Sequence, residues 1–403
     1  MLPVPRFIAV LIPALLSLTA MTAMTACKAP VLEKYGSGVV SDWPAYGATA
    51  GGTHFSYSDQ ISPDNVAHLE VAWHHRSGDF REGVRDGENF VSQSSFQTTP
   101  IVVEDRLYYC TPFNRVFALH AETGEEIWSF DPQVNMQDVP VLPNCRGVSS
   151  WQSGENGVCE HRILVATFDA RLIALDADTG KRCEDFGEGG EIDTSNGIAK
   201  HKPRDYGITS PPAILGDNLV TGSMVLDNQG TGQPSGIVRA YNVRSGALEW
   251  VFNPVPPGMP ERNPDGTWLN GTTNVWSIIA ADEDLNLVYL PTGNTNPDYY
   301  GGHRQGENGN GLDYYSSSVV ALDGDSGEVA WNFQMVHHDI WDYDTPAQPT
   351  LVDLTVEGEK IPALVQVTKM GLTFVLNRIT GEPVWPVEER PAPQEGAAEG
   401  EYL

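Results

Sequence analysis

Apolar and polar residues alternate in short segments along this chain, a pattern that favours β-strands over helices. Residues 106–110, 115–120 and 126–130 form three such segments, with only a few turn-forming residues between them. Thr123 and Gly124 lie between the second and third segments and predict a tight turn, because glycine readily adopts a positive φ. We therefore predict three neighbouring strands of one small sheet in this region.

One motif recurs along the sequence: Ala, any residue, Asp, His or Asn, two residues, Thr or Ser, Gly, three residues and Trp. Its copies occupy residues 118–128, 174–180, 240–250, 321–331 and 375–385. In the second copy Cys183 stands one residue short of the Trp position, and the fifth copy has Val375 for Ala. Each unit would bury its face only against a neighbour, with the Trp packed across to the next unit. That arrangement is a β-propeller.

This repeat resembles the tryptophan-docking motif of quinoprotein alcohol and sugar dehydrogenases, which implies an all-β fold with eight blades in the family. The motif glycines, from Gly124 to Gly381, are about 64 residues apart on average. Eight such blades would need about 510 residues. We expect about five to six blades here, in a partial propeller over residues 42–403 that lacks a C-terminal portion and exposes sheet edges and an apolar blade face.

Composition narrows the class of partner. The 40 glycines and 29 prolines suit many short strands joined by turns. The 53 acidic residues against 24 Lys and Arg give a net charge of −29. Such a surface repels phosphate backbones, so no nucleic-acid partner is expected.

The N-terminus predicts export. Arg6 precedes an apolar run that ends in residues 24–27, Met-Thr-Ala-Cys. This resembles a bacterial lipoprotein signal peptide over residues 1–26, with Cys27 lipidated and residues 27–41 as a linker. An uncleaved membrane anchor is the alternative, since about 20 apolar residues can span a bilayer. Either reading predicts a periplasmic, membrane-attached protein of a Gram-negative bacterium.

Four further cysteines stand at positions 110, 145, 159 and 183. An oxidising compartment permits disulfides, and four cysteines allow three connectivities. The shortest loop favours a bond between Cys145 and Cys159.

The densest polar segment is residues 337–346, His-His-Asp-Ile-Trp-Asp-Tyr-Asp-Thr-Pro. Together with the motifs above, it resembles PQQ-dependent dehydrogenases of the membrane-bound glucose/quinate type, from Asp42 nearly to the C-terminus. The resemblance implies Asp342 as the general base that removes a hydroxyl proton. Asp339 and Asp344 are alternatives that could instead order the loop, and a plain polar loop between blades is the alternative for the whole segment.

The same resemblance assigns further residues. Lys369 would donate to the quinone oxygens of pyrroloquinoline quinone (PQQ) and stabilise developing charge. Asp227 and Asn228 offer hard oxygen ligands for Ca²⁺, although an Asp-Asn turn is common without a metal. Trp276 would stack on the PQQ ring, and Arg146 would pair with PQQ carboxylates; a core Trp and a structural salt bridge are the alternatives.

Three positions depart from the glucose-type pattern or match it weakly. Gln97 stands where glucose-type members have Glu, and Leu142 stands where they have His. Asn296, in the site loop of residues 291–297, stands where relatives can have Thr. Gln97 and Asn296 are still expected near the cofactor, but glucose itself becomes a doubtful substrate.

The expected function is PQQ- and Ca²⁺-dependent oxidation of a sugar, polyol or cyclic alcohol, with electrons passing to ubiquinone or a periplasmic cytochrome. One alternative is a non-catalytic propeller lipoprotein, similar to outer-membrane-assembly scaffolds. Another is a secreted glycan-binding propeller. A glycine-rich nucleotide loop after a strand and a Cys-x-x-Cys-His haem motif are both missing from the sequence, so NAD, FAD and covalent haem are not indicated.

Overall fold

The computed structural model describes residues 42–403, apart from residues 87–88, 92, 137–141, 229 and 305–310. The predicted signal peptide, Cys27 and the linker lie outside the described residues. The predicted first sheet is confirmed, with strands β4 (Arg106–Cys110), β5 (Val116–His120) and β6 (Glu126–Phe130), and a fourth strand, β3 (Ile101–Val103), completes it. We call this sheet blade 1.

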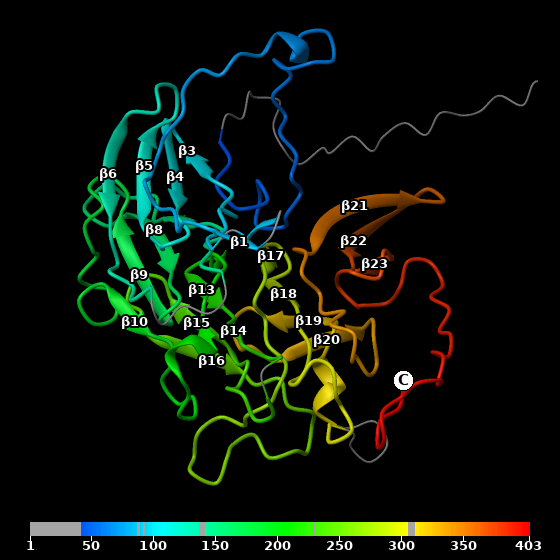
Figure 1. The fold of residues 1–403 in the computed structure, drawn as a ribbon. Helices are drawn as coiled ribbons and strands as arrows, with labels where there is room; N and C mark the ends of the chain where they lie inside the picture. Colours follow the sequence, from blue (N-terminus) through cyan, green and yellow to red (C-terminus); the bar gives the residue numbers. More distant parts are fainter. Residues whose placement is uncertain (1–41, 87–88, 92, 137–141, 229, 305–310) are drawn as a thin grey trace, which may run out of the picture. The chain divides into compact units, whose positions relative to one another are not determined.

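Four more antiparallel sheets follow in chain order among the described residues (Figure 1). Blade 2 contains β7 (Ser149–Gln152), β8 (His161–Ala166), β9 (Arg171–Asp176) and β10 (Glu191–Asp193). Blade 3 contains β12 (Ala213–Leu215), β13 (Asn218–Thr221), β15 (Val238–Asn242) and β16 (Leu248–Phe252). Blade 4 contains β17 (Ala280–Asp282), β18 (Leu287–Pro291), β19 (Ser318–Asp323) and β20 (Val329–Gln334). Blade 5 contains β21 (Thr350–Val356), β22 (Glu359–Val367) and β23 (Thr373–Asn377).

The remaining elements are short. They are the ribbons β1 (Val84–Asp86) with β2 (Asn89–Val91) and β11 (Tyr206–Gly207) with β14 (Met224–Val225), and the 3₁₀ helices η1 (Val66–His68), η2 (Pro203–Asp205) and η4 (Leu312–Tyr315). Five blades within the described residues agree with the lower end of the expected five to six.

Each blade is held to the next by the docking predicted from the motif. The rings of Trp128, Trp250 and Trp331 lie against the motif glycine of the following copy, where an added Cβ would come within 2.6 Å of the ring. Each indole N–H also donates to a backbone oxygen there, for example from Trp250 to Gly324 at 2.8 Å. The four largest apolar clusters of the described residues are shared in the same way, since each contains buried side chains from two successive blades.

Two further motif glycines have contacts that the motif does not predict. Trp73 lies on Gly124, although no Thr-Gly turn precedes it. The second copy has no Trp to dock on Gly246, the motif glycine of the third copy. A Cβ added to Gly246 would instead lie 2.6 Å from the backbone nitrogen of Gly187. Trp385, the Trp of the fifth motif copy, is 50% exposed.

The predicted Cys145–Cys159 disulfide is wrong. The bonds join Cys110 to Cys145 and Cys159 to Cys183. Loop length misled the prediction, because blade stacking decides which cysteines meet. Cys110 ends β4 beside the segment that enters blade 2, and Cys183 follows the blade 2 motif turn.

Strand order places two kinds of connection at opposite ends of the blades. Because the strands are antiparallel, the motif turns between third and fourth strands all lie at one end, which we call the turn end. The connections that enter a blade, and those between second and third strands, lie at the other end, which we call the loop end. Every predicted site residue in the described chain falls in a loop-end connection.

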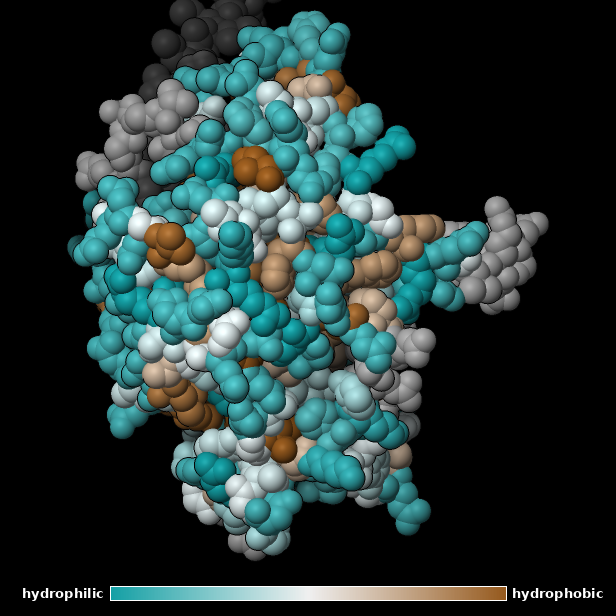
Figure 2. All heavy atoms as spheres, turned by 90° about the vertical axis from the view of Figure 1, so that its left-hand side faces the viewer, coloured by the Kyte–Doolittle hydropathy of each residue, from teal (hydrophilic) through white to brown (hydrophobic). Residues whose placement is uncertain are grey.

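The surface agrees with the acidic composition. The face shown in Figure 2 is mostly hydrophilic, with apolar side chains in small separate groups. Within the described residues, no helix has the length and apolar character needed to cross a membrane.

Candidate active site

A lysine and two aspartates form the centre of the loop end. Asp342 and Asp344 lie between β20 and β21, and Lys369 follows β22. The Lys369 ammonium donates to Asp342 Oδ1 at 3.0 Å and also to Asp344 Oδ1. The predicted base and the predicted cofactor lysine are therefore in direct contact.

The two carboxylates differ in environment. The Asp342 side chain is 42% exposed, whereas that of Asp344 is 5% exposed. Burial, together with the neighbouring Asp342, raises the pKa of Asp344 to about 7, although Lys369 opposes this shift. Burial alone would lower the pKa of Lys369, but its bonds to both carboxylates outweigh burial and raise it. Asp342 has a φ of +61°, an uncommon conformation for a non-glycine residue that the surrounding contacts must hold.

Trp276 and Arg146 extend this centre. The Trp276 indole N–H donates to Asp344 Oδ2 at 2.6 Å, and the Arg146 guanidinium lies over the Trp276 ring, 4.8 Å from its centroid. Arg146 Nη1 donates to Thr209 Oγ1 at 2.5 Å. Burial lowers the pKa of Arg146 to about 10, and no carboxylate in the described part of the chain forms an ion pair with it. The site thus holds a half-buried cation ready for an anionic group.

A second cluster, rich in oxygen atoms, surrounds Asp227. Asn274 Nδ2 donates to Asp227 Oδ2, and Asn296 Nδ2 donates to the Asp227 backbone oxygen, each at 3.4 Å. Asn228 follows Asp227 in the same turn. Burial is the main cause that raises the pKa of Asp227 to about 6, and the charge of Asp342 adds to it. The predicted metal pair therefore lies close enough to the predicted base for their charges to interact.

Asn274 and Asp298 were not singled out from the sequence, and Asn294 lies within the predicted loop of residues 291–297. The buried atoms Asn274 Oδ1, Asn294 Oδ1 and Asp298 Oδ1 have no hydrogen-bond partner among the described residues. Burial, reinforced by the charges of Asp227 and Asp342, raises the pKa of Asp298 to about 8. Asp298 directly follows the predicted loop of residues 291–297, so extending that loop by one residue would have found it.

Close backbone packing supports the segment that carries Asn274 and Trp276. A Cβ at Gly236 would lie 1.9 Å from the Thr273 backbone oxygen, and one at Gly222 would lie 2.1 Å from that of Val275. Only glycine permits this approach. The backbone of blade 3 therefore fixes the depth at which Trp276 lies.

The other predicted residues have different roles. Asp339 is fully buried; it accepts hydrogen bonds from Ser317 Oγ at 2.7 Å and from the Trp341 backbone at 3.0 Å. These contacts support its alternative assignment, ordering of the loop. Gln97 and Leu142 are both exposed, in segments that enter blades 1 and 2. Gln97 lies two residues before Thr99, whose N–H donates to the Arg146 backbone oxygen at 2.9 Å.

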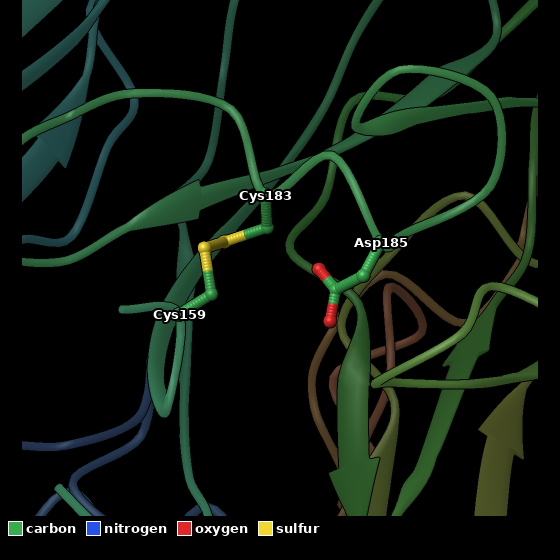
Figure 3. A group of neighbouring side chains, drawn as sticks. All are labelled: Cys159, Cys183 and Asp185. Atoms are coloured by element: carbon green, nitrogen blue, oxygen red, sulfur yellow. A yellow bond between two sulfur atoms is a disulfide. The ribbon is translucent and has the colours of Figure 1, made fainter. Parts of the chain in front are cut away.

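One apparent metal group is better explained as a disulfide. Cys159, Cys183 and Asp185 lie together (Figure 3). The two cysteines are bonded to each other, so they offer no thiolate, which is the form that binds metals. Asp185 is paired with Arg162 at 2.5 Å.

Solved structures share this fold. A quinohemoprotein alcohol dehydrogenase of Pseudomonas putida HK5 aligns with a TM-score of 0.70 and 29% identity, over 88% of this chain and 49% of that one. A europium-containing methanol dehydrogenase aligns with a TM-score of 0.67 and 26% identity, over 85% of this chain and 57% of that one.

Curated proteins are similar over the same region. Quinoprotein glucose dehydrogenase of Escherichia coli is 41% identical over 90% of this chain and 45% of that protein. The glycerol dehydrogenase large subunit of Gluconobacter thailandicus is 38% identical over 89% of this chain and 48% of that protein. Quinate/shikimate dehydrogenase (quinone) of Acinetobacter baylyi is 36% identical over 87% of this chain and 44% of that protein. The chain thus spans a little under half the length of these curated relatives.

The family model described as PQQ, glucose/ethanol/alcohol dehydrogenase, beta-propeller domain, matches residues 43–403. This range covers all five blades and both polar clusters at the loop end. The chain therefore belongs to the family of PQQ-type glucose, ethanol and alcohol dehydrogenase β-propeller domains.

Proposed function

We propose that this chain carries the site for PQQ- and Ca²⁺-dependent oxidation of a sugar, polyol or cyclic alcohol. The observation that carries the proposal is the pairing of two clusters at the loop end. Lys369 bridges Asp342 and Asp344 in one, and buried oxygen atoms gather around Asp227 in the other.

The residues present fit PQQ, which has carboxylates and a planar ring. Arg146 is a half-buried cation without an acidic partner in the described chain, and carboxylates of the cofactor would fill that role. Trp276 offers an aromatic face, and Lys369 can donate to a quinone oxygen. When bound, PQQ would accept the hydride from the alcohol carbon.

The oxygen cluster fits a hard cation. Asp227, Asn228, Asn296 and Asp298 supply carboxylate and amide oxygens, the ligand types that Ca²⁺ prefers. Unpartnered buried oxygen atoms and raised carboxyl pKa values both indicate negative charge and dipoles that a bound cation would stabilise.

Asp342 would remove the hydroxyl proton of the substrate. Its side chain is the more exposed of the two carboxylates bound to Lys369, so a substrate can reach it. Lys369 would hold it in place through their ion pair. Asp344, with a pKa near 7 and a bond to Trp276, would fix the other side of the lysine.

The substrate class, the location and the electron acceptor are proposed from the relatives and from the leader sequence. The relatives are named for glucose, glycerol and quinate or shikimate, which supports the proposed substrate class. Gln97 and Leu142 argue for a substrate other than glucose. We further propose residues 1–26 as a signal peptide, Cys27 as a lipidated anchor before the linker of residues 27–41, residues 42–403 as a partial propeller, a periplasmic location, and ubiquinone or a cytochrome as acceptor.

A titration of the full chain with PQQ, with and without Ca²⁺, tests cofactor binding. We expect saturable binding by absorbance, tighter with Ca²⁺, and at least tenfold weaker Ca²⁺ dependence in Asp227→Asn. The matched control is Asp325→Asn, an exposed aspartate in the blade 4 motif turn, which should bind as the wild type does. A folded chain that binds no PQQ would support the scaffold alternative.

Dye reduction with aldoses, cyclic polyols and simple alcohols tests catalysis. A positioned general base contributes about 100- to 10,000-fold to rate. We expect Asp342→Asn to lose activity within that range while its PQQ binding stays within about threefold of wild type. Full activity in this variant would remove Asp342 from the mechanism.

A further inference from the structure

The last residues of the chain reach back to the loop that carries Asp342. The Glu401 side chain is 2% exposed, and its two oxygens contact different loops. Oε1 contacts His338 Nε2 at 2.6 Å, and Oε2 accepts the Gly301 N–H at 2.5 Å. The Tyr402 ring stacks on the His338 ring at 4.3 Å. A buried carboxylate with two donors is a specific contact rather than a loosely placed tail.

The cradle for this carboxylate is closely packed. A Cβ on Gly301 would lie 2.3 Å from His338 Cε1 and 2.4 Å from Arg304 Nη2. A Cβ on Gly302 would lie 2.6 Å from the Gly400 backbone oxygen. The two adjacent glycines therefore leave the space that both His338 and the tail occupy.

His338 requires two protons in this arrangement. Its Nδ1 contacts Asp313 Oδ2 at 2.6 Å, on the side opposite Glu401. An ionised carboxylate can only accept a hydrogen bond, so a ring between two of them must donate from both nitrogens. His338 is then an imidazolium, and Glu401 supplies one of the two charges that keep it so.

This cluster is joined to both site loops. Arg304 donates to the Thr295 backbone oxygen at 2.6 Å and to the Asp339 backbone oxygen at 2.9 Å, and it pairs with Asp313 at 3.2 Å. Thr295 precedes Asn296 of the oxygen cluster. Asp339 lies three residues before Asp342, whose left-handed backbone needs support from its neighbours.

We propose that Glu401 is a positioning residue: its carboxylate clamps His338 and Gly301 and so holds the loop that presents Asp342. The role of Asp342 that this serves rests on the proposed function, whereas the clamp itself does not. Removing the carboxylate would loosen residues 337–342 without touching the substrate or the cofactor.

Hydrogen exchange of the full chain without PQQ tests the clamp independently of activity. Loss of a charge-assisted hydrogen bond corresponds to about tenfold faster opening. We expect about tenfold faster exchange over residues 337–346 in Glu401→Ala and Glu401→Gln. Glu399→Ala is the control, because Glu399 is an exposed glutamate two residues earlier. Unchanged exchange in both Glu401 variants would overturn the proposal.

Formate supplies a second readout. Glu401→Ala leaves a space lined by the Gly301 N–H and His338, which a small carboxylate can enter. Formate should restore slow exchange in Glu401→Ala and have no effect on wild type or Glu399→Ala. In the PQQ- and Ca²⁺-loaded chain, kcat should fall about tenfold with KM little changed, and formate should restore it.

The two proposals can fail separately. An inactive wild type with a formate-sensitive Glu401→Ala exchange pattern would reject the proposed function and keep the clamp. If the wild type is active and Glu401→Ala has the wild-type exchange rates and kcat, the proposed function stands and the clamp is rejected.

Discussion

The two ends of the blades solve opposite physical problems. At the turn end, each Trp ring covers the next motif glycine and its indole N–H finds a backbone oxygen. At the loop end, carboxylates crowd one another, the half-buried Arg146 lacks an acidic partner within the described chain, and amide oxygens stay unpaired. One end stabilises the fold, and the other keeps polar groups available for ligands at some cost in stability.

This contrast explains why the turn end repeats and the loop end does not. Docking uses the same Gly and Trp at three blade interfaces, because these interfaces share one geometry, whereas the second copy replaces the Trp ring with the Gly187 backbone. Each loop, in contrast, supplies a different group to one shared site. Repetition in sequence therefore marks the scaffold, and departures from repetition mark the candidate chemistry.

Truncating one docked Trp should produce the largest loss of stability. Trp331 is 8% exposed and lies on Gly381, whereas Trp385 has the same motif position and is 50% exposed. Trp331→Ala should cost about 3–5 kcal/mol in the free energy of unfolding. Trp385→Ala should cost about 0.5 kcal/mol. Urea denaturation of both variants measures the difference, and equal losses would show that docking does not hold the blades together.

A glycine pair separates docking from backbone strain. Gly327 has a φ of +71°, and its added Cβ would lie 2.6 Å from Trp250. Gly358 has a φ of +92° with nothing within 4 Å. Gly358→Ala should cost about 1 kcal/mol, the strain of a left-handed residue. Gly327→Ala should cost about 2–3 kcal/mol, because the Trp250 ring must also move. Equal losses of unfolding free energy would assign the effect of Gly327 to strain alone.

The sequence predicted the blades because their signal is local. The strands of blade 1 and the docking of Trp128, Trp250 and Trp331 all follow from alternation and the motif. Trp73 was missed because no Thr-Gly turn precedes it to mark it as a docking residue. The disulfides were missed because pairing depends on how blades stack, which loop length does not report.

The site was predictable where a resemblance named a residue, and much less so elsewhere. Asp342, Lys369 and Trp276 were expected to share a site, and they do lie in one hydrogen-bonded group. Asn274 and Asp298 give no periodic signal, since a loop asparagine or aspartate is ordinary in sequence. Glu401 was invisible for another reason: its partners are 63 and 100 residues away.

Neutralising one carboxylate at the loop end should stabilise the protein when no metal is bound. Asp227 is half-buried beside other acidic groups, which raises its pKa and makes its charge costly at neutral pH. Asp227→Asn should raise the metal-free unfolding free energy by about 1 kcal/mol and remove the further stabilisation that Ca²⁺ gives. Asp325→Asn, at the turn end, should do neither. Thermal melts with Ca²⁺ or a chelator measure both effects, and a less stable Asp227→Asn would mean that the carboxylate serves the fold.

The smallest effect should be a pH dependence of the tail contact. Burial alone would lower the pKa of His338, but its bonds to Asp313 and Glu401 raise it above the usual 6.5, with Arg304 opposing. Burial alone would raise the pKa of Glu401, but the Gly301 N–H and His338 lower it below the usual 4.5.

These opposite pKa shifts define a pH range in which both groups stabilise the docked tail. The His338 contribution is complete below pH 6.5 and is lost as the pH rises through its raised value. The Glu401 contribution is complete above pH 4.5 and is lost as the pH falls through its lowered value. Docking of the tail should therefore be strongest between pH 4.5 and pH 6.5. Protection of the Gly301 amide, corrected for intrinsic exchange rates, should peak there in wild type and be flat in Glu401→Gln. A flat wild-type profile would mean that the His338–Glu401 ion pair adds nothing to docking, and that the tail is held by the Gly301 N–H bond to Glu401 and the stacking of Tyr402 on His338.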